Sequence, residues 1–302
     1  MEQHQNLTAR LQAAGIACRV EVSLATHTSL KVGGPAADFG PPADEAQLCQ
    51  AVRLCRELAV PCYLLGNGSN ILFGDRGYAG AVVSLAGMKG EVRREGNTLT
   101  APAGMPLSVL CTAALRAGLT GLEFAYGIPG TVGGAVYMNA GAYGGEMKDV
   151  LVSVRYLTAE GQIVEAPAAE LDLGYRHSVF ESNGGCTLSA AVRLAPGNPG
   201  AIAARMDDLM GRRRDKQPLD KPSAGSTFKR PAGAFAGALI EQCGLRGYRH
   251  GGAAISEKHC GFVVNLGGAT CADVLALCAE VQKIVKEQTG FTLEKEIRVV
   301  EL

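Results

Sequence analysis

The stretch from Gly121 to Glu146, GLEFAYGIPGTVGGAVYMNAGAYGGE, is the part of the chain on which the interpretation of the rest depends. It holds eight glycines in twenty-six residues, far above the average usage of about 7%. Apolar and aromatic residues stand between the glycines, so the segment can pack into a core while leaving backbone N–H groups accessible at chosen points. Two interpretations stay open from composition alone. One is a site for a long ligand with phosphates and a flat ring system, and the other is a tightly packed structural loop.

A second glycine-rich turn precedes this stretch. Residues 62–65 have the pattern of a buried strand and run directly into Gly66-Asn67-Gly68-Ser69-Asn70. Such a turn can direct several amides at one anion, and Ser69 and Asn70 add side-chain donors. The pattern is neither a Rossmann fingerprint nor a Walker loop, because no helix is expected after it and no Gly-Lys-Ser/Thr occurs. Phosphate binding and a plain hairpin turn both remain open.

Composition narrows the class of protein. The chain has 302 residues, and its 29 basic and 29 acidic side chains balance to a net charge of zero. This length is enough for two domains, and the balanced charge gives no indication of a nucleic-acid partner. No apolar run is long enough to span a membrane, and the N-terminal sequence lacks the layout of a secretory signal. We therefore expect a cytoplasmic protein with no membrane partner, and a monomer.

The cysteine and histidine patterns argue against disulfide bonds and against a metal site. The ten cysteines lie mostly inside apolar stretches, and no C-x-x-C occurs. The five histidines show no metal-ligand spacing. We expect free thiols that act as small apolar core residues, and no metal site.

Periodicity and turn residues predict segregated helices and short strands, which is typical of an α+β fold. Helices are expected over residues 6–14, 45–58 after the cap Asp44, 106–117, 199–214 after the cap Asn198, 232–243, and 271–289 after the cap Thr270. Strands are expected over residues 18–24, 62–65, 71–73, 150–157, 162–165, 186–194, 225–229, 252–255, 261–265 and 292–300, with three more over 81–102.

The Pro-Gly-rich run at residues 196–200 predicts a boundary between a larger domain, 1–196, and a smaller domain, 197–302. Arg212, Arg213 and Arg214 lie near the end of the helix that follows this boundary. Cations at that end complement the helix dipole, and a place near a diphosphate is the alternative.

Six stretches occur together in one order: GNGSN at 66–70, GIPGTVGGAVYMNAGAYGGE at 127–146, YRHSVFE at 175–181, SAGSTFKRP at 223–231, LIEQCGLRGYRHGGAAISEKHCGFVVN at 239–265 and LEKEIRVV at 293–300. Together they resemble the UDP-N-acetylenolpyruvoylglucosamine reductase family, from about residue 20 to the end of the chain. The resemblance implies a PCMH-type FAD-binding domain, as in vanillyl-alcohol oxidase, made of two α+β subdomains and followed by a smaller α+β substrate domain. It implies non-covalent FAD, NADPH as co-substrate, and the enolpyruvyl ether of UDP-N-acetylglucosamine as the molecule reduced.

The resemblance also assigns residues to the cofactor. The pyrophosphate would lie at the turn after residue 65 and at the loop from residue 128, and the flavin ring near residues 139–141. The implied FAD contacts are Gly66, Asn67, Gly68, Ser69, Asn70, Ile128, Pro129, Gly130, Thr131, Gly134, Ala135, Asn139, Ala140 and Gly141.

Three residues match the catalytic positions of the family. A hydride from flavin N5 would add to the terminal vinyl carbon and leave an enolate-like anion on the adjacent carbon and its carboxylate. Arg176 would bind that carboxylate, Ser226 would donate the proton, and Glu296 would act in a protonated or proton-sharing form. Taken singly, each residue also has a purely structural explanation. Arg176 could be a surface cation and Ser226 a strand hydroxyl. Glu296 could be half of an ion pair with Lys295 or Arg298.

Substrate contacts are expected at Tyr175, Lys216, Lys229 and Arg230, with the basic residues near the diphosphate. Three further residues either contact the substrate or hold its domain together: Arg246, Tyr248 and His259.

The chain departs from the family pattern at two places. His27-Thr28-Ser29 stands where an Asn-Thr-Thr or Asn-Thr-Ser run is usual, although we expect no covalent flavin link. The interval from Arg176 to Ser226 leaves little room for the tyrosine-bearing loop of one branch, which indicates the loop-lacking second type. Another FAD-dependent oxidase or dehydrogenase of the same fold, or a non-catalytic flavin or nucleotide-sugar binding protein, are the alternatives.

Overall fold

The structure is a computed structural model, and it describes residues 2–86, 88 and 90–301. The chain forms two compact units. Unit 1 comprises Met1–Val20, Asp38–Asn67 and Gly80–Arg213, and unit 2 comprises Glu21–Ala37, Gly68–Ala79 and Arg214–Leu302. The chain therefore passes between the units several times. The division into domains 1–196 and 197–302 stays a prediction.

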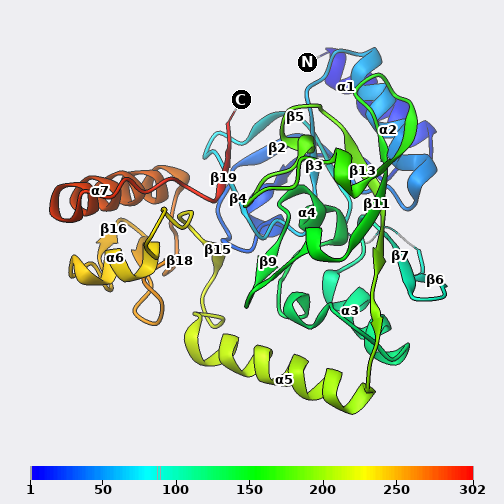
Figure 1. The fold of residues 1–302 in the computed structure, drawn as a ribbon. Coiled ribbons are helices and arrows are strands. Elements are labelled where there is room, and N and C mark those ends of the chain that lie inside the picture. The colour runs from blue at the N-terminus through cyan, green and yellow to red at the C-terminus, as the bar shows by residue number, and fades with distance from the viewer. Residues whose placement is uncertain (1, 87, 89, 302) are drawn as a thin grey trace. The chain divides into compact units, whose positions relative to one another are not determined.

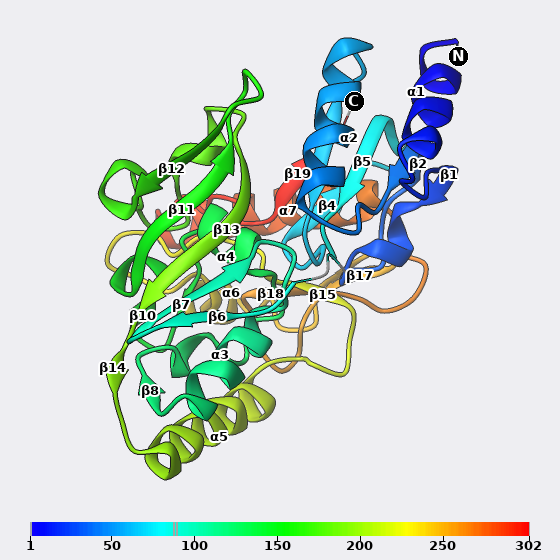
Figure 2. The same ribbon diagram turned by 90° about the vertical axis from the view of Figure 1, so that its right-hand side faces the viewer.

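Unit 1 is built around a five-stranded antiparallel sheet in the order β12-β11-β13-β7-β6, in which the neighbouring strands β11 and β13 are clear in Figure 2. Its strands are β6 (Arg93–Glu95), β7 (Thr98–Pro102), β11 (Leu151–Leu157), β12 (Ile163–Pro167) and β13 (Cys186–Arg193). Helix α3 (Leu107–Arg116) buries Leu107, Leu110, Cys111 and Ala114 in the same core. This i, i+3, i+4, i+7 stripe is the one that the sequence predicts for a half-buried helix.

Unit 1 contains further helices and strands. They are α1 (Glu2–Ala13), α2 (Glu45–Glu57), β3 (Cys62–Leu65), β8 (Leu119–Thr120), α4 (Val132–Tyr137), β9 (Gly141–Ala142), β10 (Gly145–Glu146), β14 (Ala195–Pro196) and most of α5 (Pro199–Lys216). As expected, Asp44 caps α2 by accepting from the Gln47 amide at 2.9 Å, and Asn198 accepts from the Ala201 amide at 3.1 Å. A four-stranded sheet follows the order β1-β2-β5-β3, formed by β1 (Arg19–Ser23), β2 (Pro35–Gly40), β5 (Tyr78–Ser84) and β3.

Unit 2 places two helices, α6 (Ala236–Gln242) and α7 (Cys271–Thr289), beside a four-stranded antiparallel sheet (Figure 1). The strands of this sheet follow the order β15 (Ser223–Ser226), β18 (Phe262–Asn265), β17 (Ala253–Ile255) and β16 (Arg249–His250). In a separate two-stranded sheet, β19 (Arg298–Val300) pairs in parallel with β4 (Ile71–Phe73). The predicted capping box of α7 is confirmed, because Thr270 and Asp273 satisfy each other's amides. Gly290 ends the helix in a left-handed conformation, with φ +78°.

Several elements differ from the sequence expectations. The strand expected over 225–229 is β15 at Ser223–Ser226, and the helix expected over 6–14 already begins at Glu2 in α1. The glycine-rich stretch contains α4, which was not predicted, since Gly133 and Gly134 lower helix propensity and only tertiary packing supports so short a helix. The helix expected over 232–243 begins only at Ala236, because Gly233 is left-handed with φ +76° and belongs to a turn. The strand expected over 292–300 is regular only at Arg298–Val300, because the chain first bridges Phe228 through Lys295 and then turns to pair with β4. The three strands expected over 81–102 are β5, β6 and β7, and residues 87 and 89 between them lie outside the described residues.

The ten cysteines all lie among the described residues and are free thiols, as predicted. Burial raises the pKa of the Cys111 and Cys186 thiols to about 12, so both are inert apolar groups at neutral pH. Within the described part of the chain, none of the helices combines the length and the apolar character that a bilayer crossing needs.

Candidate functional site

The turn after β3 lies against the loop that opens the glycine-rich stretch. Asn67 Nδ2 donates to the Pro129 backbone oxygen at 2.8 Å. A Cβ on Gly66 would stand only 2.7 Å from Thr131 Oγ1, so no side chain fits there without displacing Thr131. Two stretches that were expected to hold phosphates are thus brought together within unit 1.

Thr131 also organises the loop itself. Its Oγ1 accepts from the Gly134 amide at 3.2 Å and so caps α4. The amides of Val132 and Gly133 donate to the backbone oxygens of Met105 and Ala103, at 2.9 and 2.8 Å. The loop is therefore held to the segment between β7 and α3 by backbone bonds, and its glycines allow the close approach.

Asn139 is a fully buried amide at the end of α4, with φ +38°. Its Nδ2 donates to the Gly174 backbone oxygen at 2.8 Å and to Glu146 Oε2 at 2.9 Å, and its Oδ1 accepts from the Lys148 amide at 2.9 Å. A buried amide whose donors and acceptor are all paired holds its surroundings rigidly. Asn139 thus fastens the β9–β10 hairpin to the turn that carries Arg176.

Arg176 stands at the tip of a two-residue turn. The Gly174 and His177 amides each donate to the other's backbone oxygen, at 3.2 and 3.3 Å, and Arg176 takes a left-handed φ of +55°. Its Nη2 donates to the Gly141 backbone oxygen at 3.2 Å, and its guanidinium lies 5.0 Å from the Tyr175 ring centroid. Left-handed backbone is uncommon for a residue with a long side chain, so the surrounding contacts must maintain it.

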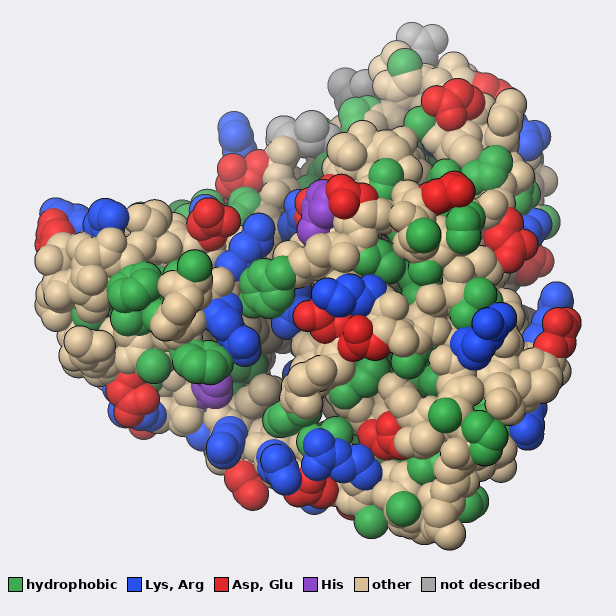
Figure 3. All heavy atoms as spheres, viewed as in Figure 1, with side chains coloured by type: hydrophobic (Ala, Val, Ile, Leu, Met, Phe, Trp, Pro, Cys, Tyr) green, Lys and Arg blue, Asp and Glu red, His purple; other side chains and the backbone are tan. Residues whose placement is uncertain are grey.

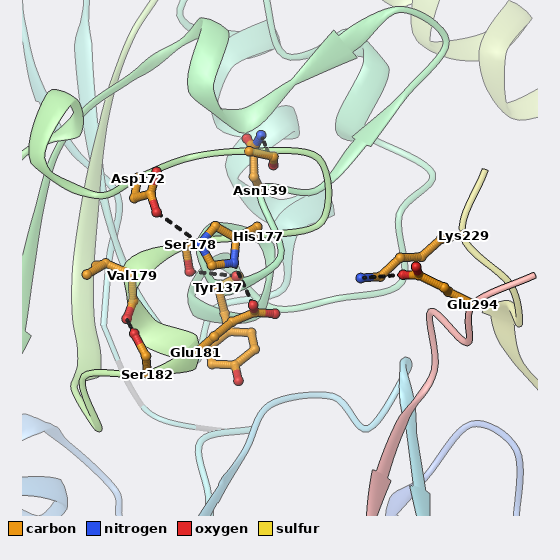
Figure 4. A network of polar contacts seen from close by, with 11 residues as sticks. Tyr137, Asn139, Asp172, His177, Ser178, Val179, Glu181, Ser182, Lys229 and Glu294 are labelled. Atoms are coloured by element: carbon orange, nitrogen blue, oxygen red, sulfur yellow. Dashed lines mark hydrogen bonds and ion pairs between the residues drawn. The ribbon is translucent and has the colours of Figure 1, made fainter. Parts of the chain in front are cut away.

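His177 braces that turn from the other side. Figure 4 shows its ring between two carboxylates, with Nδ1 2.5 Å from Glu181 Oε2 and Nε2 3.1 Å from Asp172 Oδ2. The adjacent Ser178 Oγ donates to the Tyr137 backbone oxygen at 2.7 Å, which ties the segment to the end of α4. The structure therefore joins Arg176 with the residues 139–141 that were expected near the flavin ring.

In unit 2, the turn residues Gly68 and Asn70 contact two distant parts of the sequence. The Ser29 amide donates to the Gly68 backbone oxygen at 3.0 Å, and a Cβ on Gly68 would overlap the His27 backbone oxygen. Asn70 Nδ2 donates to the Glu296 backbone oxygen at 3.2 Å. The variant run at His27 thus lies against one side of the turn that contains Ser69, and Glu296 against the other.

Ser226 and Glu296 lie on neighbouring backbone segments of unit 2. The Glu296 amide donates to the backbone oxygen of Thr227 at 2.8 Å, one residue beyond Ser226, and Thr227 is itself buried in the sheet. Both candidate side chains are half-buried. The two residues that match the proton-transfer positions are therefore neighbours, although they are far apart in the sequence.

The four candidate substrate contacts are spread over both units. Tyr175 belongs to unit 1, whereas Lys216, Lys229 and Arg230 belong to unit 2. Lys229 Nζ lies 3.8 Å from Glu294 Oε2 (Figure 4), an exposed pair of little energetic weight. The three residues of open role each have a contact within unit 2. Arg246 pairs with Glu241 at 2.5 Å, a hydrogen bond to Glu280 raises the pKa of Tyr248, and His259 Nδ1 accepts from the Gly261 amide at 3.1 Å.

The structure adds Arg213 to the candidate residues. A Cβ on Gly127 would lie 3.0 Å from Arg213 Cδ and 3.3 Å from its Nη1, so the side chain reaches the start of the glycine-rich loop. Burial lowers the pKa of Arg213. The signal in the sequence is spacing, since Ile202, Met206 and Leu209 form the buried stripe of α5 and Arg213 continues it.

Two other arginines of α5 form exposed ion pairs, unlike Arg213. On the face shown in Figure 3, Lys and Arg side chains gather along the lower edge, where α5 lies in Figure 1. Arg205 and Arg212 both pair with Asp208, at 2.8 and 2.9 Å, on the exposed side of the helix. The dipole explanation suits Arg212, which is solvated and lies near the end of the helix, and it does not account for the inward contact of Arg213.

Two protein-family comparisons match separate parts of the chain. Residues 41–167 match the family described as FAD binding domain, and residues 217–300 match the C-terminal domain of UDP-N-acetylenolpyruvoylglucosamine reductase. These ranges contain most of the residues described above for the cofactor and for proton transfer.

Relatives that align with nearly the whole chain are reductases of the same name. The UDP-N-acetylenolpyruvoylglucosamine reductase of Clostridium perfringens is 48% identical over 281 residues, covering 93% of this chain and 92% of the relative. That of Clostridioides difficile is 47% identical over 282 residues, covering 93% of both chains. The crystal structure of the enzyme from Thermus caldophilus aligns with a TM-score of 0.80 at 36% identity, and covers 95% of this chain and all of that one.

Proposed function

Because the chain belongs to the UDP-N-acetylenolpyruvoylglucosamine reductase family, we propose that Arg176, Ser226 and Glu296 carry its reaction. The enzyme is an FAD-dependent oxidoreductase of peptidoglycan precursor synthesis with NADPH as co-substrate. The observation that carries the proposal is the hydrogen bond from the Glu296 amide to the Thr227 backbone oxygen, which places the backbone segments that carry Ser226 and Glu296 next to each other.

Unit 1 offers a cradle that fits FAD. When bound, FAD takes a hydride from NADPH and delivers it to the vinyl carbon of the enolpyruvyl ether. The turn at Gly66 packs against Thr131 with no space for a Cβ, and Asn67 holds it to the loop at Pro129. The backbone amides of the turn and of the loop are thus close together, where both can approach a pyrophosphate. Arg213 adds a half-buried cation next to that loop, and an anion compensates such a cation best.

Gly66→Val is expected to abolish FAD binding, so that the purified protein is colourless. The added side chain would displace Thr131, which also removes the cap of α4 at a cost of about 1 kcal/mol. Absorbance in the flavin band and titration with FAD measure the effect. Gly211→Ala is the control, because nothing lies within 4 Å of a Cβ there in α5. A yellow Gly66→Val protein with unchanged FAD affinity would contradict the cradle.

Arg213→Met is expected to weaken FAD binding by about 10- to 100-fold, the value of one charge-assisted contact to a phosphate. The free energy of unfolding of the apoprotein should not fall, because burial penalises the charged form of Arg213. Arg212→Met removes a solvated cation from the same helix and should leave FAD affinity unchanged. Equal FAD affinities of the two variants, measured by titration of apoprotein, would show that Arg213 has no role at the cofactor.

Arg176 is assigned to the substrate carboxylate. Hydride addition to the terminal vinyl carbon leaves negative charge on the adjacent carbon and on its carboxylate. A planar guanidinium binds a carboxylate with two parallel hydrogen bonds and stabilises that charge as it develops. The turn from Gly174 to His177 and the bond to Gly141 hold the guanidinium in one place before the substrate arrives.

Ser226 is assigned as the donor of the proton that completes the reaction. A serine hydroxyl is a weak acid, but a developing carbanion is basic enough to take its proton. Glu296, on the adjacent segment, acts on the same anion in a proton-sharing form. Atoms balance when one hydride and one proton are added across the vinyl double bond.

The diphosphate of the substrate is assigned to unit 2, with Lys229 and Arg230 as its contacts and Lys216 as a secondary one. Tyr175 of unit 1 remains a weaker candidate for a substrate contact. Lys229 and Arg230 follow Ser226 within four residues, just beyond the end of β15, so one ligand can reach all three. We also assign the chain to the second, loop-lacking type, because β13, β14 and α5 occupy most of the interval from Arg176 to Ser226. A cytoplasmic monomer remains part of this proposal.

Separate half-reactions test the proposal. Under anaerobic conditions NADPH should bleach the flavin band, and the enolpyruvyl ether of UDP-N-acetylglucosamine should then restore it in one turnover. Flavin that stays reduced after the ether is added would refute the assigned reaction.

A further inference from the structure

Phe235 is the most exposed of the large apolar side chains that the structure describes, with 62% of its surface accessible. The residues that follow it in α6 are buried at i, i+3 and i+4 of the helix, namely Ala236, Leu239 and Ile240. Phe235 stands just before this stripe, in extended backbone with φ −113° and ψ 124°. Its exposure is therefore a consequence of where the helix begins, and the core of unit 2 does not use the ring.

A tight turn sets Phe235 beside Arg230. The Ala234 amide donates to the Pro231 backbone oxygen at 3.2 Å, and Gly233 has φ +76°. A turn with proline first and a left-handed glycine third reverses the chain, so the residues on either side of it come together. Accordingly, the Arg230 guanidinium lies 4.5 Å from the centroid of the Phe235 ring.

A cation over an exposed ring favours a particular ligand. The guanidinium is attracted to one face of the ring, which fixes the ring's orientation, and most of the residue stays accessible. A planar aromatic group can stack on such a ring, and an adjacent arginine can bind a phosphate attached to it. A nucleoside diphosphate combines both features in one molecule.

The order of residues matches the order of groups in the substrate. Ser226 is assigned to the enolpyruvyl group, Lys229 and Arg230 to the diphosphate, and Phe235 follows them along the same segment of unit 2. In the substrate, the sugar with its enolpyruvyl group, the diphosphate and the uridine follow one another in the same sequence.

We propose that Phe235 is a specificity-determining residue that stacks on the uracil base of the nucleotide-linked substrate while Arg230 binds the diphosphate. This inference rests on the proposed function, because it takes the nucleotide sugar as the ligand. Stacking of a base on an aromatic side chain changes affinity by about 5- to 150-fold in nucleic-acid binding proteins. The Phe235 ring should contribute within that range and should act on binding, with no part in the chemical step.

Titration of the holoenzyme with UDP and with inorganic pyrophosphate separates the base from the phosphates. Phe235→Ala should raise the Kd for UDP by about 10-fold or more and leave that for pyrophosphate unchanged, whereas Arg230→Ala should raise both. Phe235→Tyr keeps a stacking ring and should retain the UDP affinity. Leu266→Ala is the control, because it removes another exposed apolar side chain of unit 2.

Steady-state kinetics give the second readout. Phe235→Ala should raise KM for the enolpyruvyl substrate with kcat and flavin reduction by NADPH unchanged. A Kd for UDP within twofold of the unaltered enzyme would overturn the inference, and so would an equal loss for UDP and pyrophosphate. Unchanged UDP binding together with altered sedimentation would assign the ring to a contact between copies of the chain. If the unaltered enzyme did not turn over the enolpyruvyl substrate at all, the proposed function would be refuted. Failure of the proposed function is therefore distinct from failure of the inference about Phe235.

Discussion

Ser226→Ala is expected to slow turnover of the enolpyruvyl substrate by about 10²- to 10⁴-fold, the usual contribution of a positioned general acid. Reduction of the flavin by NADPH should proceed at the normal rate, because that half-reaction requires no proton from Ser226. The side chain is half-buried and lies at the end of β15, so loss of one hydroxyl should hardly change stability. Stopped-flow measurement of the two half-reactions under anaerobic conditions separates these effects.

Ser223→Ala provides the matched control, because Ser223 begins the same strand and pairs with Val264. It should show both half-reactions at normal rates. If Ser226→Ala reoxidised the flavin with the enolpyruvyl substrate as quickly as the Ser223 variant, Ser226 would not be the proton donor. A variant that is slow in both half-reactions would point to a disturbed FAD site instead.

Arg176→Ala is expected to lower kcat/KM for the enolpyruvyl substrate by about 10²- to 10³-fold, as removal of one charge-stabilising donor does. Arg176→Lys should recover only part of the loss, since a lysine keeps the charge without the planar fork. Because Arg176 has φ +55°, the backbone strain is present in all three proteins and does not confuse the comparison. The measurement is again the rate of flavin reoxidation by the substrate.

Tyr175→Leu serves as the companion variant. It removes the ring that lies 5.0 Å from the guanidinium and leaves Arg176 in the same turn. We expect a loss of less than about 10-fold, in line with the modest strength of an exposed cation–π contact. Were the leucine variant as impaired as Arg176→Ala, the ring and not the charge would be the main contribution of this turn.

Much of the architecture follows from local sequence. Asp44, Asn198 and Thr270 are found as helix caps where they were expected, because capping depends on a side chain and amides only three residues away. The start of α6 was misplaced, because the left-handed Gly233 ends the turn before it and composition does not reveal that conformation. The short helix α4 was missed for a related reason, since its stability comes from packing and not from propensity.

Local pattern was enough to predict the α+β class, because strand and helix periodicity depend on neighbouring residues. The dependence on FAD was implied by the ordered motifs through their resemblance to the reductase family, since the glycine-rich turns alone left a structural loop open. The tertiary structure alone decided which distant groups meet. It joined Glu296 to Thr227, and Asn67 to Pro129. It also turned Arg213 inward to Gly127. Each of these contacts joins segments that are far apart in the sequence, and sequence separation does not predict distance in space. Folding brings them together because it closes the intervening chain, at a cost in conformational entropy.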